Sequence, residues 1–126
     1  MSASAGTDAR VTWDARGFFR VALHGRFDVA AAVTMFDALY EHPAHRAGAH
    51  VLYDIRDADF ALFEARRLKQ LSARVTSRPR ADRAAVVVER DLDFGIMRQW
   101  FAYSENGHGR RELFRALAPA EAWLAQ

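Results

Sequence analysis

The short apolar run Ala84–Val88 constrains the fold of this chain more than any other stretch. It ends in three consecutive valines and is bounded by charges at Arg83 and Glu89. A β-branched run without polar alternation is typical of a strand that is buried on both faces. Such a strand needs cover on both sides, and the run therefore predicts a central strand of an α/β sheet.

Strand and helix patterns alternate along the rest of the chain. Residues 10–15 and 17–25 predict two strands of a hairpin that turns at Gly17. Asp28 predicts the N-cap of a helix that stops at Pro43. The further predicted elements are a strand over 50–55, a helix over 60–76 stopped before Pro79, a strand over 83–89, a helix from Asp91 or Asp93 to Asn106-Gly107, a strand over 112–115 and a last helix opened by Pro119.

The predicted order is ββαβαβαβα. Helices that alternate with strands indicate a mostly parallel sheet, and the opening hairpin adds an antiparallel strand, so the predicted architecture is α/β with a mixed sheet of about five strands and flanking helices. A length of 126 residues favours one domain, which we expect over 10–126 after a flexible tail over 1–9.

Composition excludes several classes of function. The chain has no cysteine, which rules out disulfides, thiolate zinc sites and a cysteine nucleophile. The first ten residues have no apolar core typical of a secretory signal, and no apolar run reaches the ~18 residues of a membrane span, so we expect a cytoplasmic protein without a transmembrane segment. The net charge is only +2, and basic and acidic residues nearly balance, which argues against a specific nucleic-acid partner.

The most polar junction is the sequence VLYDIRDADF, where a buried strand gives way to Asp54, Asp57 and Asp59. In a parallel sheet Asp54 falls near the carboxyl end of its strand, where α/β folds commonly bind ligands. Carboxylates there could hold a hard cation or transfer protons. The account that we favour is that they serve the turn, with Asp57 or Asp59 capping the next helix and Asp54 paired with an arginine.

Motifs for other chemistry are missing. The sequence contains no phosphate loop, dinucleotide fingerprint, nucleophile elbow or H-E-x-x-H zinc motif, so we predict no cofactor and no catalytic residue. His42 and His45, with Glu41, are the nearest approach to a zinc set, but Pro43 breaks the helix between the histidines. We therefore predict no metal site.

The helix predicted from Asp91 onward carries a surplus of aromatic and apolar side chains. One stripe must pack on the sheet, and the remainder would mark an interface or the mouth of a ligand pocket. A homodimer or a lined apolar pocket would both use this surplus. The residues concerned are Ile96, Met97, Trp100, Phe101 and Tyr103.

Three stretches together resemble the STAS-like, or SpoIIAA-like, domain family, whose relatives include the Sec14/CRAL-TRIO-like folds. VLYDIRDADF resembles the family's strand, loop and helix element, and AAVVVERDLDFGIMRQW resembles its central strand and following helix. ELFRALAPAEAWLA resembles its C-terminal strand and helix. The resemblance covers about residues 10–125.

This resemblance implies a bacterial regulatory module that binds a protein partner without catalysis. Phosphorylatable members have a serine or threonine in the loop that here reads Arg56-Asp57-Ala58-Asp59, which has neither. Asp57 or Asp59 could imitate a permanently charged state. The alternatives are a carrier or sensor of a small apolar or lipid-like ligand and, more remotely, an enzyme using Asp54 or Asp57. The predicted partner-binding or ligand-binding residues are Asp54, Asp57, Asp59, Phe60, Met97, Trp100 and Tyr103, and the partner is another protein or a second copy of the chain.

Overall fold

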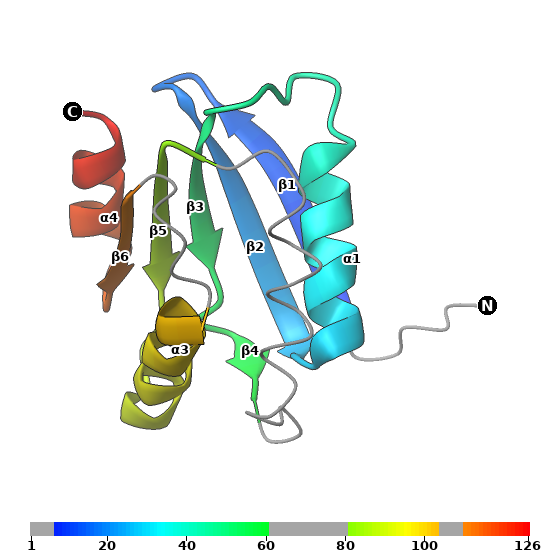
Figure 1. Ribbon diagram of the computed structural model, residues 1–126, viewed down its shortest axis with the longest axis vertical. Coiled ribbons are helices and arrows are strands. Elements are labelled where there is room, and N and C mark those ends of the chain that lie inside the picture. The colour runs from blue at the N-terminus through cyan, green and yellow to red at the C-terminus, as the bar shows by residue number, and fades with distance from the viewer. Residues whose placement is uncertain (1–6, 61–80, 104–109) are drawn as a thin grey trace.

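The computed structural model describes residues 7–60, 81–103 and 110–126. In these ranges six strands and three helices follow one another in an α/β order (Figure 1). The elements are β1 (Thr7–Asp14), β2 (Phe18–Arg26), α1 (Val29–Tyr40), β3 (His50–Asp54), β4 (Ala58–Asp59), β5 (Arg83–Val87), α3 (Asp91–Tyr103), β6 (Arg110–Phe114) and α4 (Leu117–Leu124).

The strands form one mixed sheet in the order β1-β2-β3-β5-β6. β1 and β2 are an antiparallel hairpin, and the pairs β2–β3, β3–β5 and β5–β6 are parallel. The two-residue strand β4 pairs with the end of β2, where Gly25 lies opposite Ala58. The carboxyl ends of β2, β3 and β5 therefore meet at one end of the sheet, at the bottom of Figure 1.

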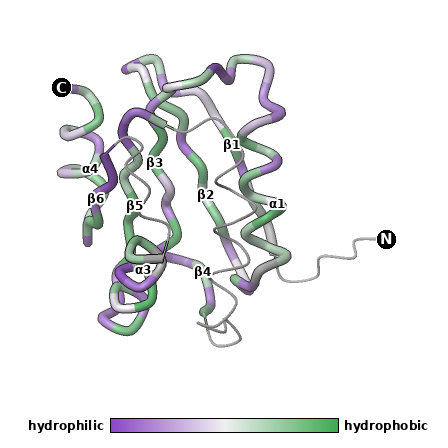
Figure 2. Tube along the Cα trace, in the orientation of Figure 1, coloured by the Kyte–Doolittle hydropathy of each residue, from purple (hydrophilic) through white to green (hydrophobic). Residues whose placement is uncertain are grey.

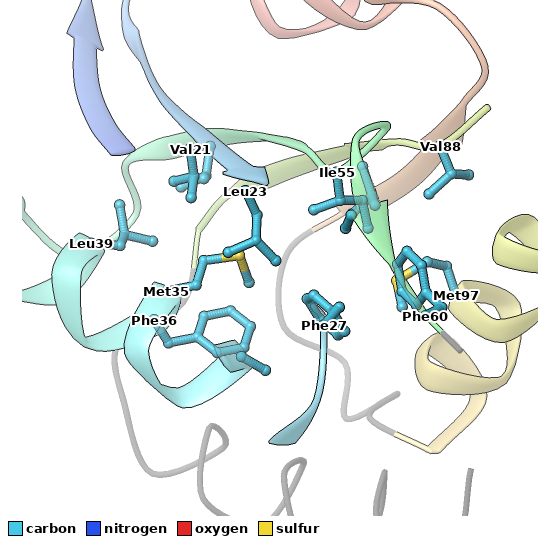
Figure 3. Packing of buried hydrophobic residues seen from close by; sticks show 14 of the residues in the cluster. Val21, Leu23, Phe27, Met35, Phe36, Leu39, Ile55, Phe60, Val88 and Met97 are labelled. Carbon is cyan, nitrogen blue, oxygen red and sulfur yellow. The ribbon is translucent and has the colours of Figure 1, made fainter. Parts of the chain in front are cut away.

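One face of the sheet packs against α1 and α3. Alternate residues of β2 point to it, and Phe19, Val21 and Leu23 are completely buried there. Asp28 begins α1 as predicted, because its carboxylate accepts a 2.8 Å hydrogen bond from the amide of Ala31. Figure 3 shows side chains of this cluster from α1, the strands and α3 meeting in one continuous core.

The other face of the sheet is covered by α4 over β3, β5 and β6. Its cluster uses the alternate residues of the same strands, among them Phe18, Leu52 and Val87, which pack against Leu124 of α4. The run of valines therefore faces both layers, as the sequence predicts for a central strand. Hydrophobic colouring runs through the middle of β3 and β5 in Figure 2.

The predicted α/β architecture is confirmed, with three differences. β1 begins at Thr7 rather than near residue 10, because the hairpin register extends to the pair Thr7–Gly25. The short strand β4 was not predicted, since a two-residue strand has no periodicity of its own. The last helix begins at Leu117, two residues before Pro119, which still lies in its first turn.

Two predicted features, the helix over 60–76 with its stop before Pro79 and the helix end at Asn106-Gly107, lie outside the described residues. None of the helices in the described ranges is long and apolar enough to cross a membrane.

Candidate functional site

The loops at the carboxyl end of the sheet bring together three of the predicted site residues. Asp54 is the last residue of β3, and the turn after it leads into β4 with Asp57 and Asp59. Backbone hydrogen bonds hold this segment against the end of β2, because the amide of Gly25 donates to the carbonyl of Asp57 at 3.4 Å and that of Phe27 to the carbonyl of Asp59 at 2.7 Å. Peptide groups of the loop therefore hold it against the end of β2.

Asp54 forms the ion pair that the sequence allowed. Arg56 donates to its carboxylate through Nε and Nη2, both at 2.9 Å, and the Arg56 amide adds a 3.3 Å bond. Burial alone would raise the pKa of Asp54, but the hydrogen bonds from Arg56 outweigh it and lower the pKa below its ordinary value. Asp54 is thus ionised at neutral pH, which makes it a weak base and gives it no proton to donate as an acid.

Asp57 and Asp59 differ from Asp54 in exposure. The Asp57 side chain is 70% exposed and lies 3.4 Å from Nδ1 of His24, which is itself exposed. Asp59 is also exposed. Exposed polar contacts contribute little to stability, and both carboxylates face solvent.

Arg90 connects this loop to the start of α3. Its Nη2 donates to the carbonyl of Ala58 at 2.7 Å, and its Nε donates to the buried carboxylate of Asp93 at 2.8 Å. The two elements that border the site are therefore held together by one side chain. The remaining residues of the first turn of α3 face solvent: Leu92 is 74% exposed, and the carboxylate of Asp91 meets Arg115 at 2.7 Å on the surface.

The sequence prediction missed Arg90 and Leu92 as site residues. Leu92 had a signal, because it falls outside the stripe of Phe94, Met97 and Phe101 that packs inward and so has no place in the core. Arg90 had none, because its partner Ala58 lies 32 residues earlier in the chain.

The other predicted site residues lie elsewhere. Phe60 and Met97 are each only 4% exposed and belong to the core, where Figure 3 places them side by side at the edge of the cluster. Phe60 also stacks on Phe27, with ring centroids 4.8 Å apart. These positions give both residues a packing role. The side chains of Trp100 and Tyr103 lie outside the described part of the structure.

His42 and His45, which the sequence offered as a weak zinc set, both lie against the ring of Phe19, at centroid distances of 5.2 and 5.8 Å. The Nδ1 atom of His42 accepts a hydrogen bond from the amide of Ala44. Burial, with the nearby His42, lowers the pKa of His45 and so favours its neutral form. Aromatic packing at the end of α1 accounts for these two imidazoles.

A groove of about 390 Å³, open to solvent, lies beside α3 and β6. Its volume is in the range of small-molecule sites, roughly 300–1,000 Å³. Apolar and charged side chains alternate around it, so its surface is amphipathic. The lining residues are Phe94, Arg98, Phe101, Arg111, Glu112 and Leu113.

No protein-family model and no curated protein sequence matches the chain. Two solved structures are similar to it along nearly the whole length. One is an uncharacterised DUF3478-family protein with a SpoIIAA-like fold from Shewanella loihica PV-4, at 16% identity and a TM-score of 0.62, with 98% of each chain covered. The other is an anti-sigma factor antagonist from Mycobacterium paratuberculosis, at 16% identity and a TM-score of 0.65, with 100% of each chain covered.

The chain therefore has a SpoIIAA-like, STAS-like α/β fold, as its sequence predicts. The predicted relation to Sec14/CRAL-TRIO-like folds stays a prediction.

Proposed function

We propose that this protein is a regulatory protein-interaction module whose binding surface is the carboxyl end of the sheet. The observation that carries this proposal is the bridge made by Arg90, which fixes the 55–59 loop to the start of α3. Around this bridge lie an exposed apolar side chain, Leu92, and exposed carboxylates at Asp57 and Asp59. We call these three residues the loop surface.

A fixed surface of this kind favours binding because little conformational entropy is lost when a partner docks. An exposed leucine among charges is typical of an interface anchor surrounded by a polar rim. The carboxylates of Asp57 and Asp59 would attract a partner that presents lysine or arginine around an apolar pocket. The loop has no hydroxyl residue, so its negative charge is permanent and needs no kinase.

The fold neighbour from Mycobacterium paratuberculosis is an anti-sigma factor antagonist, which supports a protein of regulatory type as the partner. We propose that this chain acts in the same general way in a bacterial cytoplasm, by occupying a regulator. A homodimer remains an alternative use of the surface, and a small-molecule carrier remains an alternative function.

Site-specific photo-crosslinking tests the proposal. A photoreactive amino acid is placed at Asp57 or Leu92, and matched probes are placed at Asp82 and Trp13, which are exposed and lie away from the loop surface. After irradiation in cells of the source bacterium, we expect one protein to be captured from positions 57 and 92 and not from 82 or 13. Crosslinking to a second copy of the chain would instead identify a homodimer.

Variants then test whether capture depends on the chemistry of the surface. We expect Leu92→Ala and Asp57→Asn to reduce binding of the purified captured protein by roughly tenfold each, about 1.4 kcal/mol. Asp82→Asn and Trp13→Ala are the matched controls. Equal capture at all four positions, or equal affinity of all four variants, would overturn the proposal.

A further inference from the structure

β6 (Arg110–Phe114) is one of the two edge strands of the sheet in the part of the chain that the structure describes, where it pairs with β5 alone. At the two ends of this pairing, the Arg110 amide donates to the carbonyl of Asp82 at 2.8 Å and the Phe114 carbonyl accepts from Val88 at 2.9 Å. Peptide groups alternate in direction along a strand, so the N–H and C=O of Leu113 point away from β5. Backbone N–H and C=O groups that point away from the sheet at an edge strand can pair with another strand.

The groove described above runs beside this strand, between β6 and α3. Phe94, Arg98 and Phe101 follow one another at helical spacing and form its α3 side. The guanidinium of Arg111 lies 4.7 Å from the centre of the Phe101 ring and also donates to the Phe101 carbonyl at 3.1 Å. Arg115 lies 4.5 Å from the ring of Phe94 in the same manner. The groove is thus lined by phenylalanine rings, and guanidinium groups lie against those rings.

The charge of this region is strongly one-sided. Among the groove and strand residues, Arg98 and Arg110 are exposed, Arg111 stands over Phe101, and Glu112 is the one acid. Arg115 over Phe94 adds little net charge, because it pairs with Asp91. Hydrophilic colouring marks the start of β6 in Figure 2, next to the hydrophobic β5. Charge complementarity therefore favours an acidic occupant.

We infer that β6 binds an extended acidic segment of a partner protein, which adds to the sheet as a further strand. Backbone hydrogen bonds to Leu113 would supply affinity, and alternate side chains would supply specificity. An apolar side chain would lie against Phe94 and Phe101, and a carboxylate two residues away on the same face would meet Arg98. Carboxylates on the opposite face of the added strand would meet Arg110. This surface is separate from the loop surface, and the inference does not depend on the function proposed above.

A second copy of the chain fits this edge less well than an acidic partner. Symmetric antiparallel pairing of two β6 strands about Glu112 would place that carboxylate opposite its own copy, and like charges directly opposite destabilise a strand pair. It would also bring two sets of arginines together. The observed charges therefore favour a partner of opposite sign.

The test uses a synthetic probe, the peptide acetyl-Val-Glu-Glu-Phe-Glu-Glu-Val-amide, with the full chain. Its second and sixth residues lie on the same face as the phenylalanine, toward Arg98, and its third and fifth residues lie on the other face. A second peptide has the same side chains but is N-methylated at alternate residues, so it keeps the charge and loses the donors needed for strand pairing. Binding is measured by calorimetry, and amide hydrogen exchange at Leu113 is followed by NMR. Glu112 and Phe114, which face β5, serve as internal references.

We expect the first peptide to bind and to slow exchange at Leu113 by at least tenfold, with little change at Glu112 and Phe114. Arg98→Glu should weaken binding roughly tenfold. Glu41→Gln, at the exposed end of α1, should bind the peptide as the unmodified chain does. N-methylation should abolish binding.

Three results would overturn the inference. Equal binding of the N-methylated peptide would show attraction by charge alone. Slow exchange at Leu113 that depends on protein concentration without peptide would show that a second copy occupies the edge. If no binding is detected at about 1 mM peptide, the binding free energy is weaker than about −4 kcal/mol, and the edge is not a site for this class of ligand.

Discussion

Charged side chains lie at both ends of the sheet, but the two ends use them differently. At the amino end, Asp14 and Glu121 share Arg16 and Arg20, and Glu121 comes from α4, 101 residues after Arg20. At the carboxyl end, Asp54 pairs with Arg56 only two residues away, and Asp57 is mostly exposed. The first set joins two distant segments through carboxylate–guanidinium pairs, whereas the Asp54–Arg56 pair is local and the long-range bond of Arg90 at this end goes to a backbone carbonyl.

The comparison teaches where charge stabilises the fold and where it is available for binding. The guanidiniums of Arg16 and Arg20 lie 5.3 and 5.6 Å from the centre of the Phe18 ring, so the amino-end network covers the α4-side core. Its hydrogen bonds lower the pKa of Asp14 and, through Arg20 first, that of Glu121. We therefore expect the amino end to be sensitive to mutation and the loop surface to be tolerant.

The largest expected contrast is between two apolar side chains, one at each end. Phe18 is completely buried, and Phe18→Ala should lower the free energy of unfolding by about 3–5 kcal/mol through lost burial and a cavity. Leu92 is 74% exposed, and Leu92→Ala should change it by less than about 0.5 kcal/mol. Urea unfolding followed by circular dichroism measures both values. Similar losses for the two variants would remove the distinction between the ends.

The next contrast concerns the ion pairs themselves. A double-mutant cycle of Arg20→Met with Glu121→Gln should give a coupling energy of about 1–2 kcal/mol, because the bond is charge-assisted and both side chains are three-quarters buried. The matched cycle of Arg56→Met with Asp54→Asn should give about 0.5 kcal/mol. That pair is two residues apart and can form in the unfolded chain as well. A larger coupling for the local pair would reverse the comparison.

Acid should act mainly through the same carboxylates. Asp14, Asp54 and Glu121 have pKa values below their ordinary 3.8 or 4.5, so below about pH 5 the unfolded chain binds more protons than the folded one. Their stabilisation is complete above that pH and is lost as pH falls through this range. Glu121→Gln should reduce the slope of the free energy of unfolding against pH by at most about 1.4 kcal/mol per pH unit in this range. Curves that run parallel for the variant and the unmodified chain would contradict this role of Glu121.

The sequence predicted those features of the fold that depend on local pattern. The valine run, the alternation in β2 and the Asp28 cap each act over a few residues, and the structure confirms them. An ion pair of Asp54 with an arginine was also predicted, without naming which one, and the structure places Arg56 in that role. The bond from Arg20 to Glu121 and the bridge from Arg90 to Ala58 join segments that only the tertiary fold brings together, so no local pattern indicates them.

The positions of Phe60 and Met97 also show that local sequence does not indicate which side chains the tertiary fold buries. Each was predicted to bind a partner or a ligand, Phe60 because it follows the polar loop and Met97 because it belongs to the aromatic-rich helix, whose inner stripe it was also expected to join. Both are core residues, since β4 and α3 turn those side chains inward. Neighbours along the chain indicate the type of element, but which side of it is exposed depends on what packs against it.

The smallest expected effect is the one that most sharpens the comparison. Asp57→Asn and Asp59→Asn should each change the free energy of unfolding by less than about 0.5 kcal/mol, because both side chains are exposed and the loop is held by its peptide groups. A helix-capping role for these aspartates predicts a loss of about 1 kcal/mol in the free energy of unfolding. Thermal and urea unfolding of the two variants therefore distinguishes capping from recognition. If stability is kept while binding of the captured partner falls, these carboxylates serve recognition. If the free energy of unfolding falls by 1 kcal/mol or more, these carboxylates stabilise the fold as those of the amino-end network do. The proposed difference between the two ends would then be wrong.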